Sequence, residues 1–174
     1  MLDEPGLIEQ AIAGDKDAFA ELVRQNQNRI FGFIMRMVAD RETALDLTQE
    51  TFLAAYQNLA GFRQESSFST WLFQIAANKT KNLIKKAHRE TALPDDFEQA
   101  DDGNRPDRGF EQRQQEKLLH EAMTSLPHKQ QVTFSLRYYD QLKFEEIARI
   151  LGVSVSAAKT NFAEAVKKLK KRLA

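Results

Sequence analysis

The sequence predicts an all-α protein, with two small helical domains joined by a flexible acidic linker and a helix-turn-helix in the C-terminal domain. Three observations favour this fold. Only 7 Gly and 4 Pro interrupt 174 residues, apolar residues recur every three or four positions, and that periodicity stops in a middle segment rich in Asp, Gly and Pro. We therefore expect domains at 1–89 and 118–174, with the linker at 90–117.

The first domain is predicted to begin with a short helix around residues 7–12 and a long one at 16–39. Asp15 can cap the long helix, because its carboxylate can accept a hydrogen bond from one of the first free backbone N–H groups. Apolar residues at helical spacing form one face of this helix. The residues expected in the core are Phe19, Leu22, Val23, Ile30, Ile34, Met37 and Val38.

The next helix is predicted at 41–60 and has two contrasting faces. One face is largely apolar, whereas the other combines acids and amides with a single leucine. This second face is either an ordinary solvated surface or a docking surface for a basic partner. The expected inner residues are Ala44, Leu45, Thr48, Phe52, Ala55, Tyr56 and Leu59. The residues of the opposite face are Glu42, Asp46, Gln49, Glu50, Leu53 and Gln57.

A polar loop at 62–67 leads into the last helix of this domain, predicted at 68–89 and capped by Ser66 or Ser67. Its expected buried residues are Phe68, Trp71, Leu72, Ile75, Ala76 and Leu83. Its other side carries cations and amides without an acid, namely Gln74, Asn78, Lys81, Asn82, Lys85 and Arg89. Such a stripe beside an aromatic-flanked loop suits phosphates and unpaired bases, although the aromatic rings could equally be core residues.

The C-terminal domain is predicted to contain a helix at 118–126, a second helix beginning at Pro127, and a helix-turn-helix. In that motif Ala148 lets two helices approach, Gly152 allows the tight turn, and Ser154 caps the final helix at 155–173. The start of such a helix enters the major groove of DNA. Its expected inward residues are Ala158, Phe162, Ala165, Val166, Leu169 and Leu173, and its outward ones Ser156, Ala157, Lys159, Thr160, Ala163 and Lys167.

Charge is distributed unevenly, although Lys+Arg and Asp+Glu both number 25. Residues 1–89 carry 11 basic and 11 acidic side chains, residues 90–117 carry 4 and 9, and residues 118–174 carry 10 and 5. The basic C-terminal block indicates nucleic acid as a partner, and the acidic middle block suits an electropositive surface or solvent alone.

Several function classes find no support in the sequence. There is no Cys, which excludes disulfides and thiolate sites. The N-terminus is acidic and no apolar stretch approaches the roughly 18 residues of a membrane span, so we expect a cytoplasmic protein without direct membrane insertion. The three His are not paired at metal-ligand spacing and no phosphate-binding or nucleophile motif occurs. We therefore expect no catalytic residue, no metal and no cofactor.

Several motifs follow one another along nearly the whole chain: the run at 46–52, Phe62 with the run at 67–72 and Asn78, Leu126 with Pro127, and the helix-turn-helix around 146–154. Together they resemble the extracytoplasmic-function (group 4) sigma factors of the sigma-70 family. Two motif sets in the family's order, joined by a linker, make this match more specific than either half alone.

The resemblance implies a dissociable subunit of bacterial RNA polymerase that directs promoter-specific initiation and performs no catalysis. The implied partners are the core polymerase, through the clamp helices of its largest subunit and its flap region, promoter DNA, and an anti-sigma factor. The resemblance assigns core binding to Asp46, Gln49, Glu50 and Leu53. It assigns binding of the melted −10 element to Phe62, Ser66, Ser67, Asn78, Lys81, Asn82, Lys85 and Arg89. It assigns binding of the duplex −35 element to Ser154, Ser156, Ala157, Lys159, Thr160, Ala163 and Lys167.

Some positions depart from the family pattern, and one alternative function stays open. Ala157 and Ala158 replace a frequent Thr-Val, and Asn161 and Glu164 stand where basic residues are frequent. A side chain as short as Ala157 can touch a thymine methyl group but cannot hydrogen-bond a base, so readout would lean on DNA shape. The alternative is a stand-alone helix-turn-helix regulator that binds an operator without polymerase, although its N-terminal domain would need neither the acidic face nor the cationic stripe.

Overall fold

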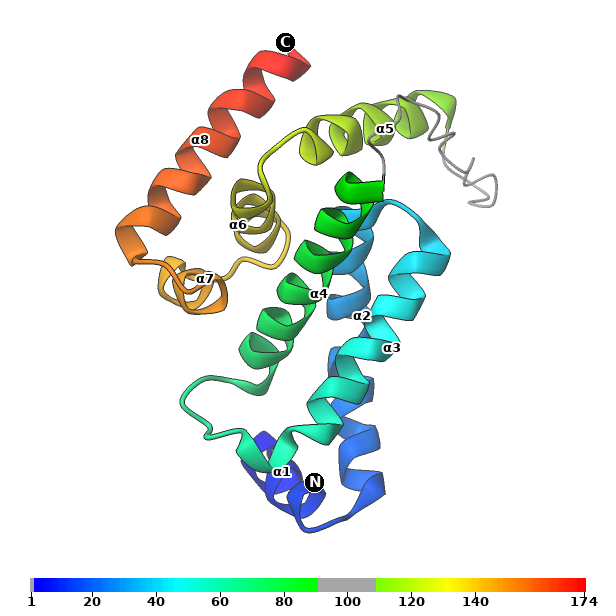
Figure 1. The fold of residues 1–174 in the computed structure, drawn as a ribbon, viewed down its shortest axis with the longest axis vertical. Helices are drawn as coiled ribbons and strands as arrows, with labels where there is room; N and C mark the ends of the chain where they lie inside the picture. Colours follow the sequence, from blue (N-terminus) through cyan, green and yellow to red (C-terminus); the bar gives the residue numbers. More distant parts are fainter. Residues whose placement is uncertain (1, 91–108) are drawn as a thin grey trace.

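The computed structural model describes residues 2–90 and 109–174, and within these ranges it contains helices and no strand (Figure 1). The first range forms α1 (Glu4–Ile12), α2 (Lys16–Val38), α3 (Arg41–Gln57), the short 3-10 helix η1 (Leu59–Gly61) and α4 (Phe68–Glu90). The second forms α5 (Phe110–Thr124), α6 (His128–Tyr138), α7 (Phe144–Leu151) and α8 (Val155–Leu173). The all-α fold class is confirmed. Residues 91–108, which include most of the predicted linker, lie outside the described residues.

The N-terminal helices pack around one core. Helix α2 lies against α3 and α4, and α1 packs on α2. Phe33 of α2 meets Phe73 of α4 edge to face, with ring centroids 5.5 Å apart, and both rings are fully buried. Three aspartates cap the starts of α1, α2 and α3 by accepting backbone N–H groups, and they are Asp3, Asp15 and Asp40. The expected Asp15 cap is thereby confirmed.

The inner face of α3 differs from the sequence prediction. Leu45 and Tyr56 were expected inside but are 42% and 45% exposed, whereas Leu47 and Thr51 are buried. The Thr51 hydroxyl donates to the Leu47 carbonyl at 2.7 Å, so a polar side chain is satisfied inside the core. A prediction from hydrophobicity alone therefore placed the buried face of α3 a fraction of a helical turn away from its true position.

Helix α5 begins earlier than predicted. Residues 110–117 were assigned to the linker, but they form the first half of α5. These residues are all exposed, so they lack the apolar periodicity that reveals a helix in sequence. They also lack Gly and Pro and are rich in Glu, Gln, Arg and Lys, which are strong helix formers. The helix predicted at 118–126 therefore begins eight residues earlier, at Phe110.

The helix-turn-helix forms as the sequence predicted. Gly152 ends α7 in the left-handed region, with φ of 66°, and the Ser154 hydroxyl accepts the Ala157 N–H at 3.0 Å to cap α8. Ala158, Ala165 and Leu169 face the core. Leu173, which was expected inside, is 47% exposed, because it lines an apolar groove between α5, α6 and α8 that no other element of the described residues covers.

The two halves of the chain pack directly against each other, which the sequence did not predict. Helix α4 contacts α7, and α2 contacts α5 and α6 (Figure 1). Residues 131–136 of α6 are all buried, because α8 covers one side of this helix and α2 the other. Leu136 and Ile147 of the second half thus share one buried cluster with Phe33 and Phe73 of the first.

His128, at the start of α6, is also part of this packing. Its Nε2 lies 3.2 Å from the Thr80 hydroxyl of α4, which itself donates to the Ala77 carbonyl. Because that hydroxyl proton is already engaged, Nε2 acts as the donor to Thr80. Burial, aided by the charge of Lys81, lowers the pKa of His128 to about 4, so the ring is neutral near pH 7.

Replacing Gly152 by Ala should lower the free energy of unfolding by about 1–2 kcal/mol, because an L side chain is strained at this φ. An added Cβ would meet nothing within 4 Å, so the loss is purely conformational. Gly61→Ala is the matched control, since it also has open space and no positive φ. Urea unfolding of both variants checks this. Equal stabilities would contradict it.

Candidate docking and nucleic-acid interfaces

The predicted docking residues of α3 lie together in solvent. Asp46, Gln49, Glu50 and Leu53 are all exposed, and we call this set the acidic face. Leu53 is 56% exposed, which makes it an apolar group surrounded by acids and amides. Lys79 of α4 lies 3.9 Å from Glu50, a distance typical of a weak surface ion pair, so the acidic face keeps its negative character. Leu45, one turn before Gln49, enlarges the exposed apolar part.

The loop at 62–67 is built on an aromatic cluster. The Phe62 ring stacks on Trp71 with centroids 4.8 Å apart and contacts Phe68 edge to face at 5.9 Å. Phe62 is only 9% exposed, so its ring is unavailable for stacking on a base in this structure. The alternative role as a core residue therefore describes its position better than direct DNA contact. Ser66 is half-buried and Ser67 exposed beside this cluster.

The start of α4 is held by two side chains. The Ser67 hydroxyl accepts the Thr70 N–H at 3.1 Å, which selects Ser67 over Ser66 as the cap. The Phe68 N–H donates to the Glu4 carboxylate of α1 at 3.0 Å. A carboxylate at a helix N-terminus also interacts favourably with the helix dipole. The role of Glu4 could not be predicted from the sequence, because its partner lies 64 positions away.

The cationic side of α4 faces solvent. Asn78, Lys81, Asn82, Lys85 and Arg89 are all exposed, and we call this set the α4 stripe. The residues that α4 buries, such as Phe73 and Ala77, lie on its other faces. Packing therefore uses the apolar faces of α4 and leaves a surface on which three cations and two amides follow each other at helical spacing.

The start of α8 is likewise available to a partner. Ser154, Ser156, Lys159, Thr160, Ala163 and Lys167 are exposed, and Ala157 is half-buried. The residues that hold α8 in place lie on its opposite side, where Ala158 and Ala165 are fully buried. The structure thus presents the predicted recognition residues on one surface of α8.

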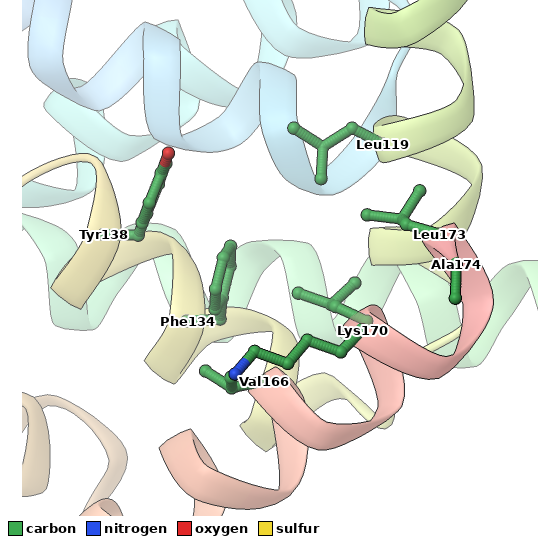
Figure 2. A pocket seen from close by; sticks show the side chains of 8 residues that line it. Leu119, Phe134, Tyr138, Val166, Lys170, Leu173 and Ala174 are labelled. Atoms are coloured by element: carbon green, nitrogen blue, oxygen red, sulfur yellow. The ribbon is translucent and has the colours of Figure 1, made fainter.

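An apolar groove in the second half was not predicted from the sequence. It has a volume of about 430 Å³ and lies between α5, α6 and α8. Figure 2 shows Leu119, Phe134 and Val166 around it, with the Lys170 side chain beside them. Val166, Leu169 and Leu173 of its lining were expected to face inward, and only the three-dimensional arrangement shows that part of this apolar surface is uncovered.

Comparison with known proteins decides the family. The family model for Sigma-70 region 2 matches residues 22–90, and that for Sigma-70, region 4 matches residues 116–169. The RNA polymerase sigma-H factor of Pseudomonas aeruginosa is 33% identical, with 96% of this chain and 92% of the relative covered. The ECF RNA polymerase sigma factor SigW of Bacillus subtilis is 30% identical, with 95% and 94% covered. The chain belongs to the extracytoplasmic-function group of the sigma-70 family.

This sigma factor also has the fold of solved proteins. CnrH, in complex with the cytosolic domain of CnrY, is similar with a TM-score of 0.75 at 23% identity, covering 96% of this chain and 94% of that chain. RpoE, in complex with the anti-sigma factor NepR from Bartonella quintana, has a TM-score of 0.68 at 19% identity, covering 89% and 96%. At these identities the likeness concerns the fold alone.

Residues 2–90 and 109–174 of this sigma factor were searched for metal-binding clusters and for membrane-spanning helices. Within those residues no group of three or more His, Asp and Glu side chains is placed to hold a metal ion. No helix in the same part of the chain has the length and apolar character needed to cross a membrane.

If Phe62 supports the loop from inside, Phe62→Ala should lower the free energy of unfolding by about 3–5 kcal/mol, because it leaves a cavity beside Trp71 and Phe68. Asn78→Ala on the exposed α4 stripe should change it by about 0.5 kcal/mol or less. Thermal or urea unfolding of the two variants measures this. Unchanged stability of Phe62→Ala together with weaker binding of single-stranded DNA would instead return Phe62 to a direct contact.

Proposed function

We propose that this sigma factor binds core RNA polymerase and directs it to promoters by reading a duplex −35 element and a melted −10 element. The observation that carries the proposal is that one chain combines the acidic face, the acid-free α4 stripe and the exposed start of α8. A regulator that binds an operator alone needs only the last of these. A polymerase subunit that opens DNA needs all three.

The acidic face of α3 serves as the polymerase-docking surface in this proposal. An exposed leucine ringed by carboxylates and amides has the anatomy of an interface hot spot, in which an apolar anchor is surrounded by polar groups. Its charge favours a basic partner surface, which we assign to the clamp helices of the largest polymerase subunit. The apolar groove between α5, α6 and α8 provides a second docking point, which we assign to the flap region.

The α4 stripe and the neighbouring loop serve the melted −10 element. Lys81, Lys85 and Arg89 can neutralise backbone phosphates, and the amides of Asn78 and Asn82 can bond to base edges. Flipping a base out of the duplex costs a few kcal/mol, which contacts of this kind must offset. Ser66 and Ser67 belong to the loop that precedes α4, and Phe62 supports this loop through its ring contacts with Phe68 and Trp71.

The start of α8 serves the duplex −35 element. Its exposed residues carry small or polar side chains, with Lys159 and Lys167 at either end of the set. Small side chains permit close approach to base edges in the major groove, while the lysines reach phosphates. Ala157 and Ala163 offer only methyl groups, so DNA shape contributes to the specificity.

The proposal includes a location and a regulator. We place the protein in the cytoplasm, acting by binding and without catalysis, and we assign an anti-sigma factor as its inhibitor. The solved protein of similar fold that is bound to the anti-sigma factor NepR supports this assignment.

The proposed function is tested by binding to purified core RNA polymerase and by transcription from a promoter library with and without the protein. Binding to core together with promoter-selective initiation is expected. Failure to bind core, combined with salt-sensitive binding of duplex DNA by the protein alone, would establish the stand-alone regulator instead.

Asp46→Lys should weaken binding to core polymerase by about tenfold or more, because it places a like charge against a basic surface. Titration of labelled core polymerase measures this affinity. Glu9→Lys on α1 is the matched control, since Glu9 is also exposed and the charge change is identical. Equal affinities for all three proteins would remove the acidic face from the docking surface.

Lys85→Glu should slow promoter opening while core affinity stays within about twofold, because one phosphate contact is replaced by repulsion. For binding to a single strand that carries the −10 element, the slope of the logarithm of the binding constant against the logarithm of salt concentration should become shallower by about one. Lys16→Glu, exposed at the start of α2, controls for the change in net charge. Opening is followed by permanganate reactivity. Parallel loss of core binding and opening would argue against the role of the α4 stripe.

A further inference from the structure

A cluster of charged and polar side chains joins the two halves of the molecule. The Arg36 guanidinium of α2 donates to the Asp140 carboxylate, which follows α6, at 2.7 Å and to the Ser135 hydroxyl of α6 at 2.7 Å. It also lies over the Tyr139 ring, 4.4 Å from the ring centroid. Arg29, two turns earlier on α2, approaches the same carboxylate at 3.8 Å.

Burial makes this cluster different from the surface ion pairs. The side chains of Asp140 and Arg36 are only 8% and 23% exposed. Burial raises the pKa of Asp140 and lowers that of Arg36, and in each case the opposite charge of the partner counteracts the shift. Each half of the chain therefore contributes a charge that is compensated only while the halves are packed together.

Other contacts across the same boundary reach the proposed −10 loop. The Gln131 amide of α6 donates to the Met37 carbonyl at 3.5 Å, and His128 bonds to Thr80 of α4. Arg149 of α7 donates to the backbone carbonyl of Glu65. The helix-turn-helix thus holds the loop that precedes α4 by a direct hydrogen bond.

The packed arrangement is too small for both promoter elements at once. The −10 and −35 elements lie about 25 base pairs apart, which is about 85 Å along B-DNA at ~3.4 Å per base pair. A compact chain of 174 residues has a radius of gyration of about 16 Å and a diameter of roughly 40 Å. The α4 stripe and the start of α8 belong to elements that both border α7, so they cannot reach both sites without separating.

We propose that the free protein is latched in a closed arrangement by the ion pair of Arg36 and Asp140, with Arg29, Ser135 and Tyr139 completing the latch, and that this latch opens before the chain spans a promoter. A buried ion pair suits this task because both charges regain water when the halves separate. The need for opening rests on the proposed function, but the latch itself is a property of the protein alone.

The latch is tested first without polymerase. The sequence contains no Cys. Arg63→Cys in the loop and Glu145→Cys in α7 therefore provide two unique sites for spin labels. Both are exposed and lie beside the contact between Arg149 and Glu65. Pulsed electron paramagnetic resonance should give a short distance between the two labels in the labelled parent protein. Asp140→Asn should raise the population of molecules with a long distance about tenfold.

Matched variants separate the latch from general damage. Glu21→Gln removes an ion pair of the same kind on the exposed surface of α2, the pair of Arg24 and Glu21, and should leave the distances unchanged. The exchanged pair Arg36→Asp with Asp140→Arg should restore the short distance. Arg36→Lys, which keeps the charge but loses the forked geometry, should open the protein to a smaller extent and serves if Asp140→Asn does not fold.

The consequence is measured with unlabelled protein and core polymerase plus promoter DNA. If only the open form binds core polymerase and promoter DNA together, Asp140→Asn should bind them more tightly than the parent does. The gain in affinity should be at most the factor by which the open population increases. Unchanged distances in Asp140→Asn, or no recovery in the exchanged pair, would overturn the latch. Weaker promoter-complex formation by an opened Asp140→Asn would overturn its inhibitory role. Failure of every variant, the parent included, to bind core would overturn the proposed function and leave the distance result to stand on its own.

Discussion

Helix α6 lies at the boundary between the two halves of the molecule and joins them. This helix packs on α8 within its own half and on α2 of the other half, so residues 131–136 are all buried. A helix in that position must satisfy its polar side chains internally, and Gln131, Thr133 and Ser135 do so through carbonyl groups or Arg36. No buried side-chain nitrogen or oxygen among the described residues lacks a partner. The relative placement of the two halves follows from this pairing.

The same packing explains why the proposed binding surfaces remain available. Helices α3, α4 and α8 each use an apolar face for the core and leave a charged or small-residue face outside. The acidic face, the α4 stripe and the start of α8 therefore coexist in the packed molecule. What packing limits is the distance between them, because α7 lies against both α4 and α8.

The features that could be predicted from the sequence depend mostly on interactions between residues close together in the chain. Asp15, Gly152 and Ser154 mark helix boundaries through capping and a positive φ, and the structure has those boundaries. The exposed start of α5 could not be recognised because it has no apolar period, and the buried Thr51 could not because its hydroxyl bonds within its own helix. Contacts between distant positions were beyond reach, since Arg36 and Asp140 are 104 residues apart.

In the proposed function, polymerase enables one chain to read duplex DNA with α8 and unpaired bases with α4. Footprinting of a promoter complex, with nuclease protection for duplex contacts and permanganate for unpaired thymines, tests both readings on the same DNA. With core polymerase present, we expect protection at the −35 element and permanganate reactivity at the −10 element, and we expect neither with the protein alone at physiological salt. Full protection by the protein without polymerase, and no reactive thymines in the complex, would contradict it.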